Sequence, residues 1–258
     1  MYPLKYAFVL LTLPLLAGSL PAQEKQATQA ESAQAKDVDP LALDVLRAVA
    51  EPVEKAQAFT FKALISEEEV ASNGQIVTFF HTTTVTVQRP DKIHLVFEGR
   101  GQRVDFFTAN GKTIMYAPDA SLYTTVSSKG TIDEIVKDLD ARDVDVPIAP
   151  FLRSDFYDLA AKMVTTGYVI GRVRLFDQDV HQLAFSSEDA DWQLWVTGGE
   201  KPRFVRAEVV NKNLEGQPRT IIQFLDWDLN PTLSPTEFTF TKSADAREIN
   251  MLPVNGGK

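Results

Sequence analysis

Few residues in this sequence have the types and spacing that metal or cofactor chemistry requires. The chain contains no cysteine, and its three histidines, His81, His94 and His181, do not show the paired spacing of metal ligands. His81 and His94 fall in segments with strand-like alternation, where a lone histidine is usually structural. We therefore predict no metal site and no cofactor.

One pattern suggests a phosphate-binding loop and another suggests catalytic carboxylates, but neither has the residues that such a site requires. Gly111-Lys112-Thr113 ends like a phosphate loop, yet Phe106 stands where that motif needs a glycine, and a strand pattern follows it instead of a helix. Asn110-Gly111 is better explained as a hairpin turn. Four carboxylates near expected strand ends have no evident partner acid: Asp189, Asp191, Asp226 and Asp228. Since no nucleophile-elbow motif occurs either, we predict that the protein is not an enzyme.

Arg89-Pro90 is the most informative step in the chain. It separates two apolar, alternating segments, 79–87 and 93–97. Proline has no backbone N–H and suits a strand end, so the chain is expected to bend there. The neighbouring arginine has five N–H donors, which could bind the free carbonyl groups at a helix end. The alternative is an exposed arginine at an ordinary turn.

The N-terminal residues indicate export. Residues 1–22 combine Lys5, an apolar run and a Leu-Pro-Ala step, which predicts a signal peptide cleaved after Ala22 and a periplasmic protein. An uncleaved inner-membrane anchor is the alternative. Residues 23–38, rich in Ala and Gln, are expected to form a flexible tether, followed by one domain over 39–250 and a tail over 251–258. The net charge of −9 argues against nucleic acid as a partner.

The elements that would position these residues are mostly strands. Asp39-Pro40 is expected to cap a helix running to about Lys55, and Thr131 to Glu134 forms a capping box for a second helix. A third helix is expected to begin at Pro150 and to continue to Met163. Period-two alternation predicts strands in segments from Phe59 onward, and in the second half over 166–176, 179–186, 191–197, 203–211, 218–229 and 236–241.

The expected fold class is mainly β with α: a curved antiparallel half-barrel of about eleven strands, covered by about three helices. Several strands are apolar on both faces, so both faces must be covered. The space under the helices could be a packed core or a cavity for an apolar ligand, and periodicity does not decide between them. The residues expected to line such a cavity or to hold its lid are Arg89, Ile93, Leu95, Phe97, Tyr116, Trp192 and Trp195.

Two resemblances bear on function. Arg89-Pro90, the segment from Gly111 to Tyr116, and Pro118-Asp119 resemble the periplasmic lipoprotein carriers of the lipoprotein-localisation type. The wider chain resembles a bacterial family of predicted periplasmic proteins of unknown function in the same fold superfamily. That second resemblance rests on four segments: Thr131 to Glu134, Asp191 to Trp195, Lys201 to Arg203, and Phe238-x-Phe240.

The resemblance to the carriers implies an open half-barrel with a helical lid that holds acyl chains, and it makes Arg89 the residue that latches the lid. We therefore expect a non-catalytic protein that binds a lipid or an acylated protein. Two alternatives stay open: an envelope-stress sensor with a membrane-associated protein partner, and a hydrolase acting on an envelope polymer.

Overall fold

The computed structural model describes residues 36–141, 144 and 146–250, and residues 34–249 form one compact unit. The expected signal peptide, its cleavage site, most of the tether and the tail lie outside the described residues. Among the helices that are described, none combines the length and the apolar character needed to cross a membrane.

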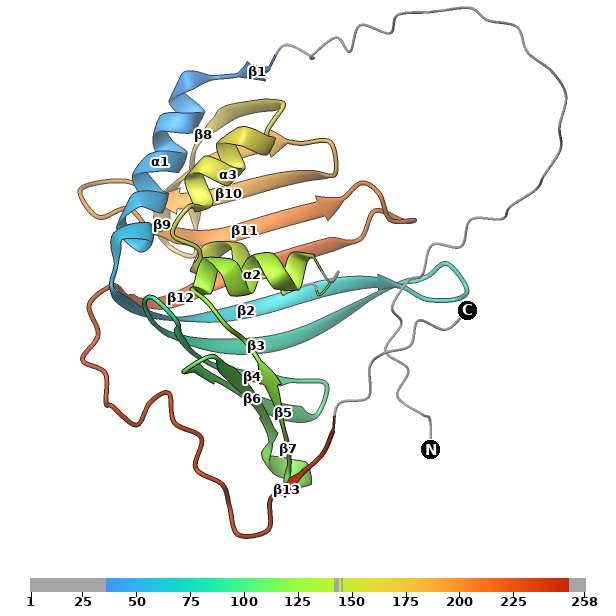
Figure 1. The fold of residues 1–258 in the computed structure, drawn as a ribbon. Helices are drawn as coiled ribbons and strands as arrows, with labels where there is room; N and C mark the ends of the chain where they lie inside the picture. The colour runs from blue at the N-terminus through green and yellow to red at the C-terminus, as the bar shows by residue number, and fades with distance from the viewer. Residues whose placement is uncertain (1–35, 142–143, 145, 251–258) are drawn as a thin grey trace, which may run out of the picture. The chain divides into compact units, whose positions relative to one another are not determined.

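One open, curved sheet forms the body of this unit (Figure 1). Its strands follow the order β1-β8-β9-β10-β11-β12-β2-β3-β4-β5-β6-β7-β13, and every neighbouring pair is antiparallel except the two outermost, which are parallel. The first seven strands in the chain are β1 (Asp37–Val38), β2 (Ala58–Val70), β3 (Ile76–Gln88), β4 (Lys92–Gly99), β5 (Gln102–Ala109), β6 (Lys112–Ala117) and β7 (Leu122–Ser127). The others are β8 (Thr166–Leu175), β9 (Gln178–Ser186), β10 (Ala190–Thr197), β11 (Phe204–Asn211), β12 (Arg219–Asp228) and β13 (Arg247–Glu248).

The expected half-barrel is therefore confirmed as a strongly curved sheet that does not close. Its edge strands, β1 and β13, have only two residues each, so the remaining strands match the expected number of about eleven. Asn110 and Gly111 both have positive φ, 54° and 76°, and form the expected hairpin turn between β5 and β6.

The helices begin where their capping residues predict. In α1 (Pro40–Lys55), the Asp39 side chain accepts a hydrogen bond from the Leu41 N–H at 2.9 Å. In α2 (Ile132–Asp140), both hydrogen bonds of the capping box between Thr131 and Glu134 are present. Both N-terminal signals are local, and for that reason the sequence alone was enough to place them.

Three sequence predictions need correction. The third helix is split into a 3-10 turn, η2 (Ala149–Leu152), and α3 (Phe156–Met163), because the chain becomes extended at Arg153 and the Ser154 N–H turns toward the Asp133 carboxylate. The end of the expected tether is ordered, since residues 37–38 form β1 and the Lys36 ammonium donates to two carbonyls at the end of α3. Residues 236–241 do not form a strand: 236–238 lie in turns, and 239–241 have no regular secondary structure.

The three α-helices lie on one face of the sheet, which we call the inner face. Beneath them the space is filled by an aromatic core. Phe151 of η2 packs edge-on against Phe204 and Phe224, with ring centroids 5.2 and 4.8 Å apart, and Phe61 lies 4.3 Å from the Trp227 ring. The packed alternative is thus the correct one directly under the helices.

On the opposite, outer face, the C-terminal segment 230–249 covers strands β4–β7. Its Phe240 ring packs against Phe107, Tyr116 and Tyr123, with centroids 5.1 to 5.9 Å away, and β13 ends the segment beside β7. The red segment in Figure 1 follows this course from β12 to β13. The C-terminal segment therefore covers the outer face of the sheet at this end, as expected for strands that are apolar on both faces.

Candidate ligand-binding face and helix junction

The inner face of β4–β6 carries an apolar row that extends the buried core beyond the helices. Leu95, Phe106 and Met115 are direct neighbours across these strands. Phe97 and Val104 form the next pair of β4 and β5 on the same face. All five side chains are half-buried, whereas Phe59 and Phe61 under the helices are 0 and 2% exposed. An apolar surface of this kind, continuous with the core but less completely buried, is the feature of the inner face best suited to contact an apolar ligand.

Arg89 lies where the helical layer meets the sheet. Its Nε donates a hydrogen bond of 3.2 Å to the carbonyl of Ala56, the residue that caps the C-terminus of α1. The next residue, Pro90, accepts a hydrogen bond of 2.8 Å from the N–H of Ile132, the first residue of α2. The Arg89-Pro90 step therefore contacts the end of one helix and the beginning of another.

Arg89 is also held among carboxylates that belong to all three helices. Burial lowers the pKa of its guanidinium, and Asp133, Glu54 and Asp155 oppose this effect because they favour the charged form. Its Nη2 is buried and has no hydrogen-bond partner among the described residues. The guanidinium remains charged under all physiological conditions, so this junction holds a partly satisfied cation.

A second arginine ties α2 to α3. Arg153 donates two hydrogen bonds, of 2.7 and 2.9 Å, to the Asp155 carboxylate and one to the Asp133 carbonyl. The hydrogen bonds from Arg153 hold the pKa of Asp155 below its usual value. Burial raises the pKa of Glu54, although its carboxylate accepts a hydrogen bond of 2.7 Å from the Tyr157 N–H. The helical layer thus rests on one connected polar network.

The residues predicted to line a cavity do not all meet. Leu95 and Phe97 lie on the inner face as described, and Ile93 is a buried core residue at 5% exposure. Trp192 also faces inward, but it is stacked on Phe185 at 4.2 Å, far along the sheet order from β4.

Tyr116 and Trp195 lie on the outer face. The Tyr116 hydroxyl is 3.1 Å from Ser243 in the C-terminal segment, and the Trp195 ring lies beneath the Arg206 guanidinium. The predicted set is therefore split between the two faces of the sheet.

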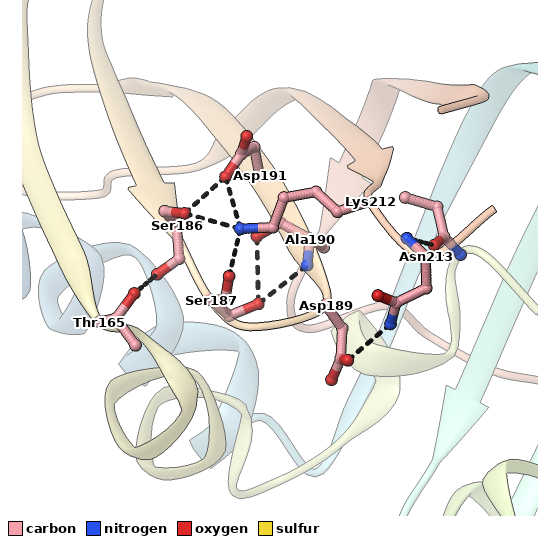
Figure 2. Close-up of polar contacts among 9 residues, drawn as sticks. Thr165, Ser186, Ser187, Asp189, Ala190, Asp191, Lys212 and Asn213 are labelled. Carbon is pink, nitrogen blue, oxygen red and sulfur yellow. Dashed lines mark hydrogen bonds and ion pairs between the residues drawn. The ribbon is translucent and has the colours of Figure 1, made fainter. Parts of the chain in front are cut away.

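Sequence reasoning missed a polar network at the turn between β9 and β10 (Figure 2). Ser186 donates a hydrogen bond of 2.5 Å to Asp191, while the Lys212 ammonium donates to Ser186 at 3.0 Å and forms an ion pair with Asp191 at 3.2 Å. The hydrogen bond from Ser186 and the charge of Lys212 lower the pKa of Asp191. These contacts connect Ser186, Asp191 and Lys212 across the turn and fix its geometry.

The described residues contain no group of three or more histidine, aspartate or glutamate side chains placed to hold a metal ion. His94 instead contacts Glu237 at 3.0 Å and stacks on Phe107, and burial lowers the pKa of His81. His81 lies 3.3 Å from the Glu67 carboxylate and 4.7 Å from the Phe97 ring, so both histidines pack on an aromatic ring and face a single carboxylate.

Comparison with known proteins places the chain in a wider context. A family model described as "Predicted periplasmic protein (DUF2092)" matches residues 42–252. Among solved structures, the lipoprotein LppX of Mycobacterium tuberculosis is similar with a TM-score of 0.50 and 13% identity, covering 76% of this chain and 98% of that one. A search of curated proteins finds no significant match.

Two further structures are similar at lower scores. LprF from Mycobacterium bovis has a TM-score of 0.48 and 12% identity, over 76% of this chain and 97% of that one. A LolA superfamily protein from Nitrosomonas europaea has a TM-score of 0.35 and 13% identity, over 77% and 97%. At 13% identity the likeness to LppX is one of fold alone.

Proposed function

We propose a function that starts from the family, since this chain belongs to the DUF2092 family of predicted periplasmic proteins. The protein would bind the acyl chains of a lipid or of an acylated protein, without catalysis. The ligand would lie along the inner face of β4–β6. Export through the predicted signal peptide of residues 1–22 is part of this proposal.

The half-buried apolar row on the inner face is the observation that carries the proposal. Leu95, Phe97, Phe106 and Met115 are joined to the packed core yet keep part of their surface accessible. Burying apolar surface of this kind contributes about 25 cal/mol per Å² removed from water. An acyl chain laid along the row would gain that free energy without requiring a new polar partner.

The helix junction would control access to this row. Because Arg89 and Pro90 contact the adjoining ends of α1 and α2, their release would let the helical layer move relative to β4. A charged hydrogen bond contributes about 1.5–3 kcal/mol, which biases an opening equilibrium without preventing it. Arg89 is thus proposed as the latch of a helical lid.

Displacement of an environment-sensitive apolar dye by fatty acid tests the binding. We expect the native protein to bind the dye saturably and Phe97→Lys to weaken that binding at least tenfold, because a lysine in the row would have to be desolvated. Phe80→Lys is the matched control, since Phe80 lies on the outer face and is 71% exposed. Equal losses in both variants, or no saturable binding by the native protein, would contradict the proposal.

A further inference from the structure

A continuous row of side chains crosses the outer face of the sheet, opposite the helices and away from the C-terminal segment. Neighbours in the row are direct partners on adjacent strands from β3 to β8: Phe80, Ser66, Ile221, Glu208, Gln193, Ala184 and Tyr168. Adjacent strands lie about 4.8 Å apart, so the six steps from Phe80 to Tyr168 amount to roughly 29 Å measured along the curved sheet. The row is long enough for an extended polymer.

The two ends of the row are exposed aromatic rings. Phe80 is 71% exposed and Tyr168 is 56% exposed, although aromatic side chains of this size are usually buried. Small residues, Ser66 and Ala184, stand next to them on the neighbouring strands. Each ring therefore projects from the sheet beside a small side chain, which leaves a depression in the surface that we call the floor of the row.

Two hollows occupy this floor. One, of about 390 Å³, lies at the Phe80 end and is lined also by Leu64, Arg206 and Gln223. The other, of about 360 Å³, lies at the Tyr168 end and is lined also by Ile170 and by Ser186 and Asp191 of the network in Figure 2. Both reach β11, where Arg206 and Glu208 are two residues apart, so the hollows adjoin along the row.

The middle of the row is polar, and its groups are held in place. Glu208 lies 3.3 Å from Arg219 and 4.0 Å from Arg206, and Gln193 accepts a hydrogen bond of 2.8 Å from Gln182. In the adjacent hollow, Gln223 Oε1 is buried without a hydrogen-bond partner among the described residues. Amide, carboxylate and guanidinium groups thus stand between two aromatic platforms, with their charges balanced within the protein.

We propose that this row is a binding groove for a linear glycan. The C–H faces of pyranose rings stack on exposed aromatic rings, and sugar hydroxyl groups pair with amide and carboxylate groups of the kind found between Phe80 and Tyr168. A protein partner fits less well, because the core of a protein interface is depleted of charged residues, whereas Glu208 stands at the centre of this row. The groove is separate from the inner face proposed for acyl chains.

Isothermal titration of the full chain with N-acetylglucosamine oligomers and with cello-oligosaccharides tests this proposal. We expect a hexasaccharide to bind saturably and a disaccharide to bind at least tenfold more weakly, because the shorter sugar cannot reach both rings. Tyr168→Ala and Phe80→Ala should each weaken hexasaccharide binding at least tenfold. Both residues are largely exposed, so both variants are expected to fold.

Phe176→Ala serves as the matched control. Phe176 is 60% exposed, at the turn between β8 and β9, and lies outside the row and outside both hollows. The Phe176→Ala variant should bind the hexasaccharide with the same affinity as the native protein. Absence of binding to every glycan, equal losses in all three variants, or binding of an unstructured peptide to the native protein in competition with the sugar would overturn the proposal. Fatty-acid binding by Tyr168→Ala should be unchanged, which separates this groove from the inner face.

Discussion

Replacing Arg89 with leucine should loosen the helical layer while leaving the sheet folded. The change removes the hydrogen bond from Arg89 Nε to the carbonyl of Ala56 and the attraction between the guanidinium and the carboxylate of Asp133. A hydrogen bond from a charged donor contributes about 1.5–3 kcal/mol. Since about 1.4 kcal/mol corresponds to a factor of ten, the opening equilibrium of the layer should rise roughly 10- to 150-fold.

Amide hydrogen exchange followed by mass spectrometry measures this opening directly. We expect faster exchange in the second half of α1, in α2 and in α3, and unchanged exchange in β2 and β3. Arg174→Leu is the control, because Arg174 is an exposed arginine whose carboxylate contacts, 3.7 and 3.8 Å long, contribute little. Unchanged exchange in all three helices of the Arg89 variant would show that Arg89 is an ordinary turn residue. Faster exchange spread evenly over the sheet would refute a local latch as well.

Three further outcomes follow from single contacts. Burial raises the pKa of Glu54 in the folded protein, so ionisation of this carboxyl group opposes folding at any pH above its pKa in the unfolded chain. Glu54→Gln should therefore raise the melting temperature at pH 7. This gain in melting temperature should disappear as the pH falls below about 4, where the carboxyl group of the unfolded chain is protonated. Thr131→Ala should cost about 1 kcal/mol in chemical unfolding, because it removes the capping hydrogen bond to the Glu134 N–H. Phe240→Ala should cost about 2 kcal/mol, somewhat less than a fully buried phenylalanine, and should change the tyrosine fluorescence of the outer face.

Features set by neighbouring residues could be predicted from the sequence. Asp39 and Thr131 cap their helices through hydrogen bonds to residues two or three positions away, and Asn110-Gly111 forms its turn within one hairpin. The antiparallel meander follows from strands separated by such turns, and this is why the half-barrel was recognisable. The bend at Pro90 is local as well, whereas the hydrogen bond from Arg89 to Ala56 joins residues 33 positions apart and was only one of two expectations for this arginine.

Features set by distant contacts could not be predicted in the same way. Residues 236–241 alternate like a strand, with Phe238 and Phe240 on one side, but these rings pack against the outer face of β4–β7, Phe238 buried and Phe240 half-buried, instead of joining the sheet. Tyr116 is paired with Asp105 on the neighbouring strand, and this register places its side chain on the outer face. The register between two strands cannot be read from the sequence of either strand alone. Trp192 and Trp195 differ from these examples: they are three residues apart on one strand, so period-two alternation alone is enough to place them on opposite faces.

The outer-face row illustrates the same limit. Phe80 and Tyr168 are 88 positions apart in the chain and share a row only because six strand pairings between them keep their registers in line. Lys212 meets Ser186 and Asp191 for a similar reason, since β11 ends beside the turn between β9 and β10. Sheet register, which the sequence does not display, brings both sets together.

Native mass spectrometry of the protein, purified from the periplasm without detergent, tests the central claim most directly. The proposed function predicts a bound mass in the range of a lipid, released by organic solvent, present on the native chain and on Phe80→Lys but reduced on Phe97→Lys. A native protein that carries no such mass, and that takes up no lipid when incubated with it, would contradict the claim.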